Sequence, residues 1–282
     1  MVRIIPRLDI KGPNLVKGIH LEGLRVLGRP SDFAELYYKT GADEIIFMDV
    51  VASLYGRNSL KEIISETAKN IFIPITVGGG IRTIKDIKDL LRCGADKVSI
   101  NTAALNDPQF IYKASREFGS STIVVSIEAV KNPNGVYYAY VDNGREFTGI
   151  EVSDWAKKVE ELGCGEILIT SVDREGTGKN FDYDLCDLVL NNVSVPVIAH
   201  GGAGKKEDVC ELFSKSGFDA VALSSILHYG AIDNFILSND TNREGNFEFL
   251  NSRRKIGNIN SLSINELKEY LISKEITCRY NE

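Results

Sequence analysis

The chain alternates short runs of β-branched residues with longer amphipathic segments, a pattern that predicts parallel strands joined by helices. Eight runs are expected to form strands: Arg3–Ile10, Glu44–Val50, Phe72–Val77, Lys97–Ile100, Thr122–Ile127, Glu166–Ser171, Val195–Ala199 and Ala220–Leu223. The segments between them show a helical period: Asp32–Thr40, Ser59–Ala68, Ile84–Arg92, Pro108–Glu117, Val152–Leu162, Asp182–Asn191 and Lys206–Ser216. Eight such units predict an α/β fold, a single (β/α)8 (TIM) barrel over residues 1–282. Functional groups are then expected at the carboxyl ends of the strands.

Two segments interrupt the alternation. Residues 136–146 alternate around Asn143–Gly144 and predict a hairpin inserted after the fifth strand. Residues 231–262 are polar and rich in Asn, and we interpret them as an insertion that is either a variable surface loop or a contact for a partner. The chain then resumes with a C-terminal helix, for which Ser263 and Glu266 have the spacing of a capping box.

The two halves of the chain repeat each other. Gly94, Asp96 and Val98 recur 123 residues later at Gly217, Asp219 and Val221, and the glycines at 78 and 79 recur at 201 and 202. The first predicted strand matches the fifth at an offset of 119 residues, which sets Asp9 against Glu128. The sequence therefore predicts a twofold half-barrel repeat with one carboxylate in each half.

Composition narrows the class of protein. A hydrophobic content of 43%, a charged content of 26% and a net charge of −6 describe a globular protein, and they argue against binding to nucleic acid or to an anionic membrane. No signal segment or membrane-spanning apolar run is present. The five scattered cysteines predict reduced thiols of a cytoplasmic protein and no metal site.

Asp9 and Glu128 are the candidate catalytic groups. They lie at the ends of the first and fifth strands, which stand on opposite walls of an eight-stranded barrel. Facing carboxylates offer a general acid and a general base to a ligand between them. The alternative is that each caps a loop or pairs with a nearby cation.

Two glycine loops predict phosphate sites. Gly78–Gly80 and Gly201–Gly204 each end a strand and precede a helix, where backbone N–H groups and the helix N-terminus favour an anion. Polar pairs, Asn101–Thr102 and Ser224–Ser225, end the neighbouring strands. Two such sites in one barrel predict a bisphosphorylated substrate.

Charged residues also occur where apolar ones are expected. Arg3, Glu44, Lys97 and Glu166 lie at strand starts, and they form either a solvated rim or a neutral ring over the barrel floor. Arg7 shares the inward parity of Arg3 and Asp9, so it requires an acidic or phosphate partner. His200 precedes the second glycine loop and is either a ligand contact or structural.

These motifs resemble the barrel family of histidine biosynthesis, in particular the cyclase subunit of imidazole glycerol phosphate synthase. The resemblance runs from Arg3 to about Tyr229 and resumes over the last helix, through the segments RIIPRLDI, TVGGGIR, GADKVSINTAA, GEILITSVDREGTG and GGAG. It implies that Asp9 and Glu128 are catalytic and that Arg3, Glu44, Lys97 and Glu166 form a gate for ammonia. The substrate and its two phosphates would be held by Lys17, Gly80, Asn101, Thr102, Gly176, Gly202, Ser224 and Ser225. It further implies a glutamine amidotransferase partner at the N-terminal face and no cofactor.

The resemblance also has departures. Glu128 replaces an aspartate of the family, Arg7 replaces a small residue, and Glu175 replaces another aspartate. A misplacement of about 1 Å can cost on the order of 100-fold in rate. An intact gate with an altered centre is also typical of a paralogous branch that relays ammonia to a sugar-amidating enzyme of surface-polysaccharide biosynthesis. The related sugar-phosphate isomerase of the same pathway needs no gate, so the four gate residues argue against it.

Overall fold

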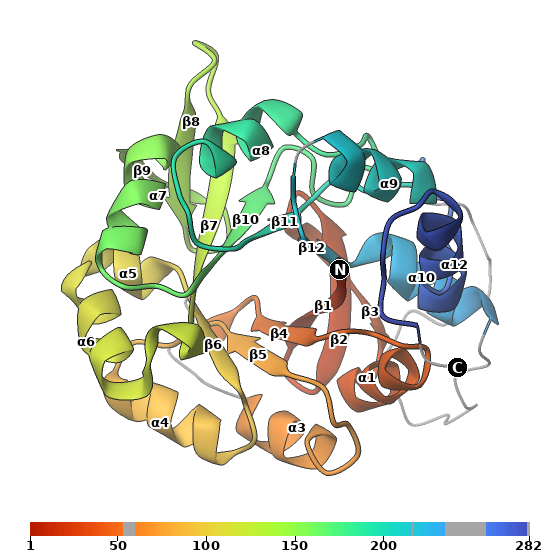
Figure 1. Ribbon diagram of the computed structural model, residues 1–282. Coiled ribbons are helices and arrows are strands. Elements are labelled where there is room, and N and C mark those ends of the chain that lie inside the picture. Colours follow the sequence, from red (N-terminus) through yellow and green to blue (C-terminus); the bar gives the residue numbers. More distant parts are fainter. Residues whose placement is uncertain (53–59, 216, 235–257, 281–282) are drawn as a thin grey trace.

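A closed barrel of parallel strands forms the centre of the molecule (Figure 1). The structure, a computed structural model, describes residues 1–52, 60–215, 217–234 and 258–280. Within these ranges the barrel strands are β1 (Arg3–Lys11), β4 (Ile45–Asp49), β5 (Ile75–Gly78), β6 (Lys97–Ile100), β7 (Ile123–Lys131), β10 (Glu166–Ser171), β11 (Val197–His200) and β12 (Ala220–Leu223). Each pairs in parallel with its neighbours, and the β7–β10 pair closes the ring. The predicted (β/α)8 barrel is confirmed.

Helices surround this ring on the outside (Figure 1). They are α1 (Pro30–Lys39), α3 (Leu60–Thr67), α4 (Ile84–Arg92), α5 (Thr102–Asn106), α6 (Gln109–Phe118), η1 (Ser120–Thr122), α7 (Val152–Glu161), α8 (Tyr183–Leu190), α9 (Lys206–Lys215), α10 (Ser225–Asn234) and α12 (Ile264–Ser273). The capping box predicted at Ser263 is present, since its side chain accepts a hydrogen bond from the backbone N–H of Glu266 and the Glu266 carboxylate accepts one from Ser263. Of the proposed insertion 231–262, residues 235–257 lie outside the described ranges.

Each half of the barrel carries a β-hairpin after its first strand. The pair β8 (Tyr137–Val141) and β9 (Glu146–Glu151) covers the predicted 136–146 segment and continues five residues beyond it. The pair β2 (Asn14–Ile19) and β3 (Glu22–Gly28) follows β1, and the sequence pattern missed it. Its two-residue turn, His20–Leu21, has positive φ angles of 53° and 61°, a conformation for which Asn and Gly are the usual signals.

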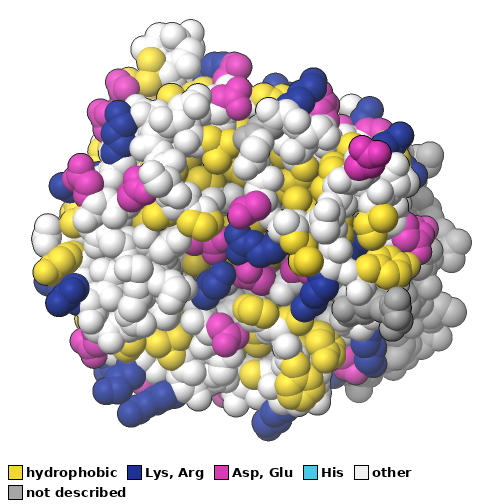
Figure 2. All heavy atoms as spheres, in the orientation of Figure 1, with side chains coloured by type: hydrophobic (Ala, Val, Ile, Leu, Met, Phe, Trp, Pro, Cys, Tyr) yellow, Lys and Arg dark blue, Asp and Glu magenta, His cyan; other side chains and the backbone are white. Residues whose placement is uncertain are grey.

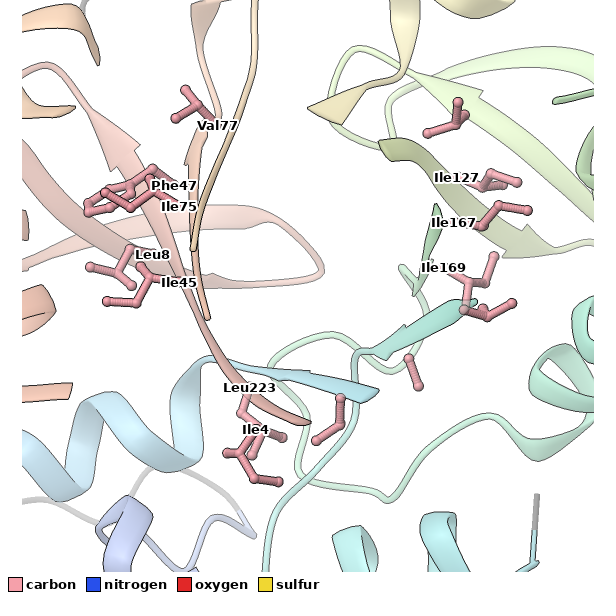
Figure 3. Packing of buried hydrophobic residues seen from close by; sticks show 14 of the residues in the cluster. Ile4, Leu8, Ile45, Phe47, Ile75, Val77, Ile127, Ile167, Ile169 and Leu223 are labelled. Carbon is pink, nitrogen blue, oxygen red and sulfur yellow. The ribbon is translucent and has the colours of Figure 1, made fainter. Parts of the chain in front are cut away.

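Strand side chains alternate between two environments. The main hydrophobic cluster lies between strands and helices, and Figure 3 shows its members on the strands, among them Leu8, Phe47 and Ile127. A second, smaller cluster fills the barrel interior and includes Ile5, Ile46, Leu168 and Ile198. Positions 3, 5, 7 and 9 of β1 therefore face inward, as the sequence parity predicts.

The repeat offset changes along the chain. A Cβ on Gly79 would meet the Asp49 carbonyl oxygen at 2.2 Å, and one on Gly201 would meet the Ser171 carbonyl oxygen at 2.7 Å. These matching contacts relate residues 49 and 79 to 171 and 201, at an offset of 122. The sequence-based alignment of these glycines, at an offset of 123, is thus wrong by one residue. The second half gains its additional residue only after this loop, so the offset of 123 begins beyond it.

Candidate active site

Arg3, Glu44, Lys97 and Glu166 form a closed ring of ion pairs. Arg3 donates to Glu44 at 2.7 Å and to Glu166 at 2.6 Å, and Lys97 donates to the same two carboxylates at 2.9 and 3.1 Å. Figure 2 shows basic and acidic side chains next to one another at the centre of the face seen along the barrel. Burial alone would lower the pKa values of Arg3 and Lys97, but the two glutamates outweigh it and raise both. The two cations of the ring are therefore held in their charged forms, and Arg3 also lies 3.6 Å from Asp219.

A cavity of about 290 Å³ opens at the carboxyl ends of the strands in the first half of the barrel. It is bordered by the first glycine loop and by the polar pair after β6. Its lining is Met48, Asp49, Val50, Gly79, Gly80, Ile81, Arg82, Ser99, Ile100, Asn101, Thr102, Ala103, Asn106, Asp107, Ser126, Glu128 and Asn143. The predicted phosphate ligands Gly80, Asn101 and Thr102 thus share one cavity with the predicted catalytic Glu128.

Glu128 is nearly buried, with 7% of its surface exposed. Its Oε2 accepts a hydrogen bond from the backbone N–H of Gly144 at 2.8 Å, in the β8–β9 turn. Burial raises the pKa of Glu128 to about 7, against the opposing effects of Arg7 and the Gly144 N–H. A carboxyl group with such a pKa can donate or accept a proton near neutrality.

Asp9 belongs to a different, filled part of the mouth. Its Oδ1 accepts from Nε of Arg7 at 3.0 Å, and both side chains are buried. Nη1 of Arg7 donates to Thr170 Oγ1 at 3.2 Å and lies 3.1 Å from Nδ1 of His200. The acidic partner predicted for Arg7 is therefore Asp9.

The second glycine loop borders a cavity of only about 20 Å³, close to the roughly 10–15 Å³ that a single water needs. Gly176, Gly202, Ser224 and Ser225 line it, together with His200 and others. The Ser224 hydroxyl donates to the Arg7 carbonyl oxygen at 2.9 Å. Of the donors predicted for the second phosphate site, the Ser224 hydroxyl thus has an acceptor within the protein.

Lys17 and Asp9 line neither cavity. Lys17, predicted to contact substrate, is buried on β2 in an ion pair with Glu175. Oε2 of Glu175 also accepts a hydrogen bond from the Leu21 backbone N–H at 3.1 Å. Glu175 therefore holds both Lys17 on β2 and the turn of the β2–β3 hairpin in place at the mouth of the barrel.

The sequence reasoning named neither Ser126, which lines the open cavity, nor Thr170, which contacts Arg7 and His200. Thr170 pairs in register with Glu128 and His200, and Ser126 lies two residues before Glu128 on the same strand. The period of two along β7 and β10 is the signal by which both could have been found.

The described residues contain no group of three His, Cys, Asp or Glu side chains that could hold a metal ion. None of the helices in those ranges is long and apolar enough to cross a membrane.

Comparison with known proteins identifies relatives over most of the chain. Residues 3–233 match the family described as histidine biosynthesis protein. The imidazole glycerol phosphate synthase subunit HisF of Legionella pneumophila is 60% identical over 207 residues, which cover 73% of this chain and 98% of that protein. The subunits of the same name from Bacillus cereus strain Q1 and Prochlorococcus marinus strain AS9601 are 48% and 49% identical, over 81% and 80% of this chain and 90% of each relative.

Proposed function

The chain belongs to the histidine biosynthesis family of barrel proteins, and we propose that it is the cyclase subunit of imidazole glycerol phosphate synthase. The observation that carries this function is the open cavity in which Glu128 lies beside the phosphate loop and the Asn101–Thr102 pair. A phosphate at that loop would set the reacting carbons of a sugar phosphate next to a carboxyl group that titrates near neutrality.

The chemistry joins ammonia to a phosphoribulosyl-formimino aminoimidazole carboxamide ribonucleotide. Ammonia adds to the ribulosyl carbonyl, and the carbonyl oxygen leaves as water. Acid–base cleavage of the formimino C–N bond then releases aminoimidazole carboxamide ribonucleotide, and ring closure gives imidazole glycerol phosphate. In our proposal Glu128 supplies and removes protons in these steps, and Asp9 is the second carboxylate. No metal or organic cofactor takes part in this scheme.

The partner we propose is a glutamine amidotransferase docked at the N-terminal face. The four-residue ring closes the barrel at that face, and the mouth cavity lies at the opposite end of the strands. Ammonia released by the partner would enter through the ring and reach the cavity along the barrel axis. We place this assembly in the cytoplasm, in keeping with five free cysteine thiols.

The decisive experiment uses purified protein, the bisphosphate substrate and an ammonium salt, with consumption of the substrate followed over time. Ammonia-dependent turnover that is lost in Glu128→Ala supports the cyclase. Absence of turnover in the wild-type protein refutes it.

A second candidate function is suggested by the Arg7–Asp9 ion pair. In this pair Asp9, one of the two proposed catalytic carboxylates, is bound to Arg7 and not to substrate. In that case the barrel would pass ammonia to a separate sugar-amidating enzyme. The relatives named above, all synthase subunits, give this candidate no support. Recovery of cyclisation in the double variant Arg7→Cys, Glu128→Asp, starting from an inactive wild-type protein, would favour it.

A further inference from the structure

Arg7, His200 and Ser224 form a closed ring of hydrogen bonds at the edge of the small second cavity. Arg7 Nη1 lies 3.1 Å from His200 Nδ1, His200 Nε2 lies 3.5 Å from Ser224 Oγ, and Ser224 Oγ donates to the Arg7 carbonyl at 2.9 Å. All three residues are buried.

The direction of every bond in this ring is fixed. A guanidinium only donates, and a carbonyl oxygen only accepts. Nδ1 of His200 must therefore be the unprotonated nitrogen, and Nε2 carries the hydrogen. Thr170 Oγ1, 3.2 Å from Nδ1, accepts from Arg7 and can donate its own proton to the same nitrogen.

The charge of His200 is fixed as well. Burial first, and then the positive charges of Arg7 and Lys17, lower its pKa well below the ordinary value. The imidazole is thus a neutral donor through Nε2–H.

We propose that His200 is a phosphate-binding residue of the second glycine loop, and that Arg7 is the positioning residue that aims its Nε2–H at the phosphate. This rests on the proposed function, since it assigns a donor to one end of the same bisphosphate. His200 lines the cavity with Gly202, Ser224 and Ser225, so all of these donors converge on one space. At 3.5 Å the bond from His200 to Ser224 is the longest in the ring, and it is the bond that an incoming phosphate oxygen replaces.

Arg7 itself retains a free donor. Among the described residues its Nη2 has no hydrogen-bond partner, although the side chain is wholly buried. An unsatisfied buried donor is costly, and a ligand oxygen at this end of the mouth would satisfy it.

Nitrogen NMR of the three histidines tests the tautomer without any need for turnover. His200 and His228 should both show Nε2–H with unprotonated Nδ1, because His228 Nε2 donates to the Arg7 carbonyl and its Nδ1 accepts from the Tyr37 hydroxyl. His20 should show Nδ1–H, because that nitrogen lies 2.8 Å from the Val172 carbonyl. Arg7→Met should change the His200 signals and leave those of His228, since the backbone carbonyl remains. A wild-type His200 with a protonated Nδ1 would overturn the proposal.

Phosphate binding is tested in the same spectra and then with substrate. Inorganic phosphate should shift the His200 Nε2–H signal of the wild-type protein, and an unmoved signal at saturating phosphate would contradict the assignment. His200→Leu should weaken binding of the bisphosphate about tenfold, equivalent to about 1.4 kcal/mol. His200→Gln, which keeps a donor, should remain close to wild type. Equal affinities of the Leu and Gln variants refute the inference, whereas a wild-type protein that shifts with phosphate but never consumes the bisphosphate refutes only the proposed function.

Discussion

Glu128→Gln should change how the stability of the barrel depends on pH. The unfolded carboxyl group loses its proton near pH 4.5, whereas the folded one keeps it until about pH 7. Between these values the native state binds more protons than the unfolded state, so the contribution of Glu128 to stability is complete below pH 4.5 and is lost as the pH rises through 7. A pKa rise of about 2.5 (from 4.5 to about 7) corresponds to about 3 kcal/mol in all. Between about pH 5 and pH 8.5 the loss is roughly 2.5 kcal/mol.

Gln has the shape of Glu, and its carbonyl oxygen can still accept from the Gly144 N–H, but it does not titrate. Every other titrating group is common to the two proteins, so the difference between their melting temperatures isolates Glu128. We expect Glu128→Gln to gain on the wild type by about 5–10 °C as the pH rises over that range, using about 2–4 °C per kcal/mol for a chain of this size. Thermal unfolding followed by circular dichroism provides the measurement. Parallel melting curves for the two proteins across the range would show that Glu128 ionises at an ordinary pKa and that its burial has been misjudged.

Three further outcomes follow from the same geometry. Lys97→Ala leaves Arg3 as the only cation of the ring for both glutamates. With the amidotransferase present, this variant should hydrolyse more glutamine per molecule of product than the exposed control Lys158→Ala. An unchanged ratio of glutamine hydrolysed to product formed would refute the gate hypothesis. Gly80→Ala forces a residue with φ of +70° into a strained conformation at the phosphate loop, and KM for the bisphosphate should rise about tenfold. Gly135→Ala, with φ of +88° and open space around it, should show the strain in stability without the change in KM. Ser263→Ala removes the N-cap of α12 and should lower the free energy of unfolding by about 1 kcal/mol in urea denaturation, and no loss would mean that this helix end does not unfold with the barrel.

Local patterns were sufficient for the barrel and for the inward direction of its polar residues. Parity along β1 placed Arg3, Arg7 and Asp9 on the inner face. Arg7 and Asp9 are buried, and the half-buried Arg3 pairs with Glu44 and Glu166 across the barrel floor. The β2–β3 hairpin was missed because its turn is formed by His20 and Leu21, which carry no turn signal, whereas the Asn143–Gly144 turn of the other hairpin does.

Partnerships between distant residues were out of reach of such patterns. Arg7 and His200 are 193 positions apart, and only the closed strand order brings them within 3.1 Å. The same holds for Lys17, which the family resemblance assigns to substrate binding but which is paired with Glu175 and lines neither cavity. Sequence reasoning could identify the charged residues and the end of the barrel at which each lies. Which residues pair with one another depends on the strand register around the whole barrel.

The inequality of the two half-sites has a simple origin in side-chain volume. In the backbone repeat, Arg7 is equivalent to Ser126, at an offset of 119. Gly201 is equivalent to Gly79 at an offset of 122, so the preceding residue, His200, is equivalent to Gly78. Where the first half of the cavity has a serine and a glycine, the second half has an arginine and a histidine bonded to each other. The first half leaves about 290 Å³ of space and the second about 20 Å³. Under the proposed function, a two-ended ligand would therefore meet one open pocket and one pocket whose His200 and Ser224 side chains are already bonded within the protein. Entry should therefore begin at the Gly80 loop, and the Arg7–His200 pair should be engaged only when the second phosphate displaces the His200–Ser224 bond.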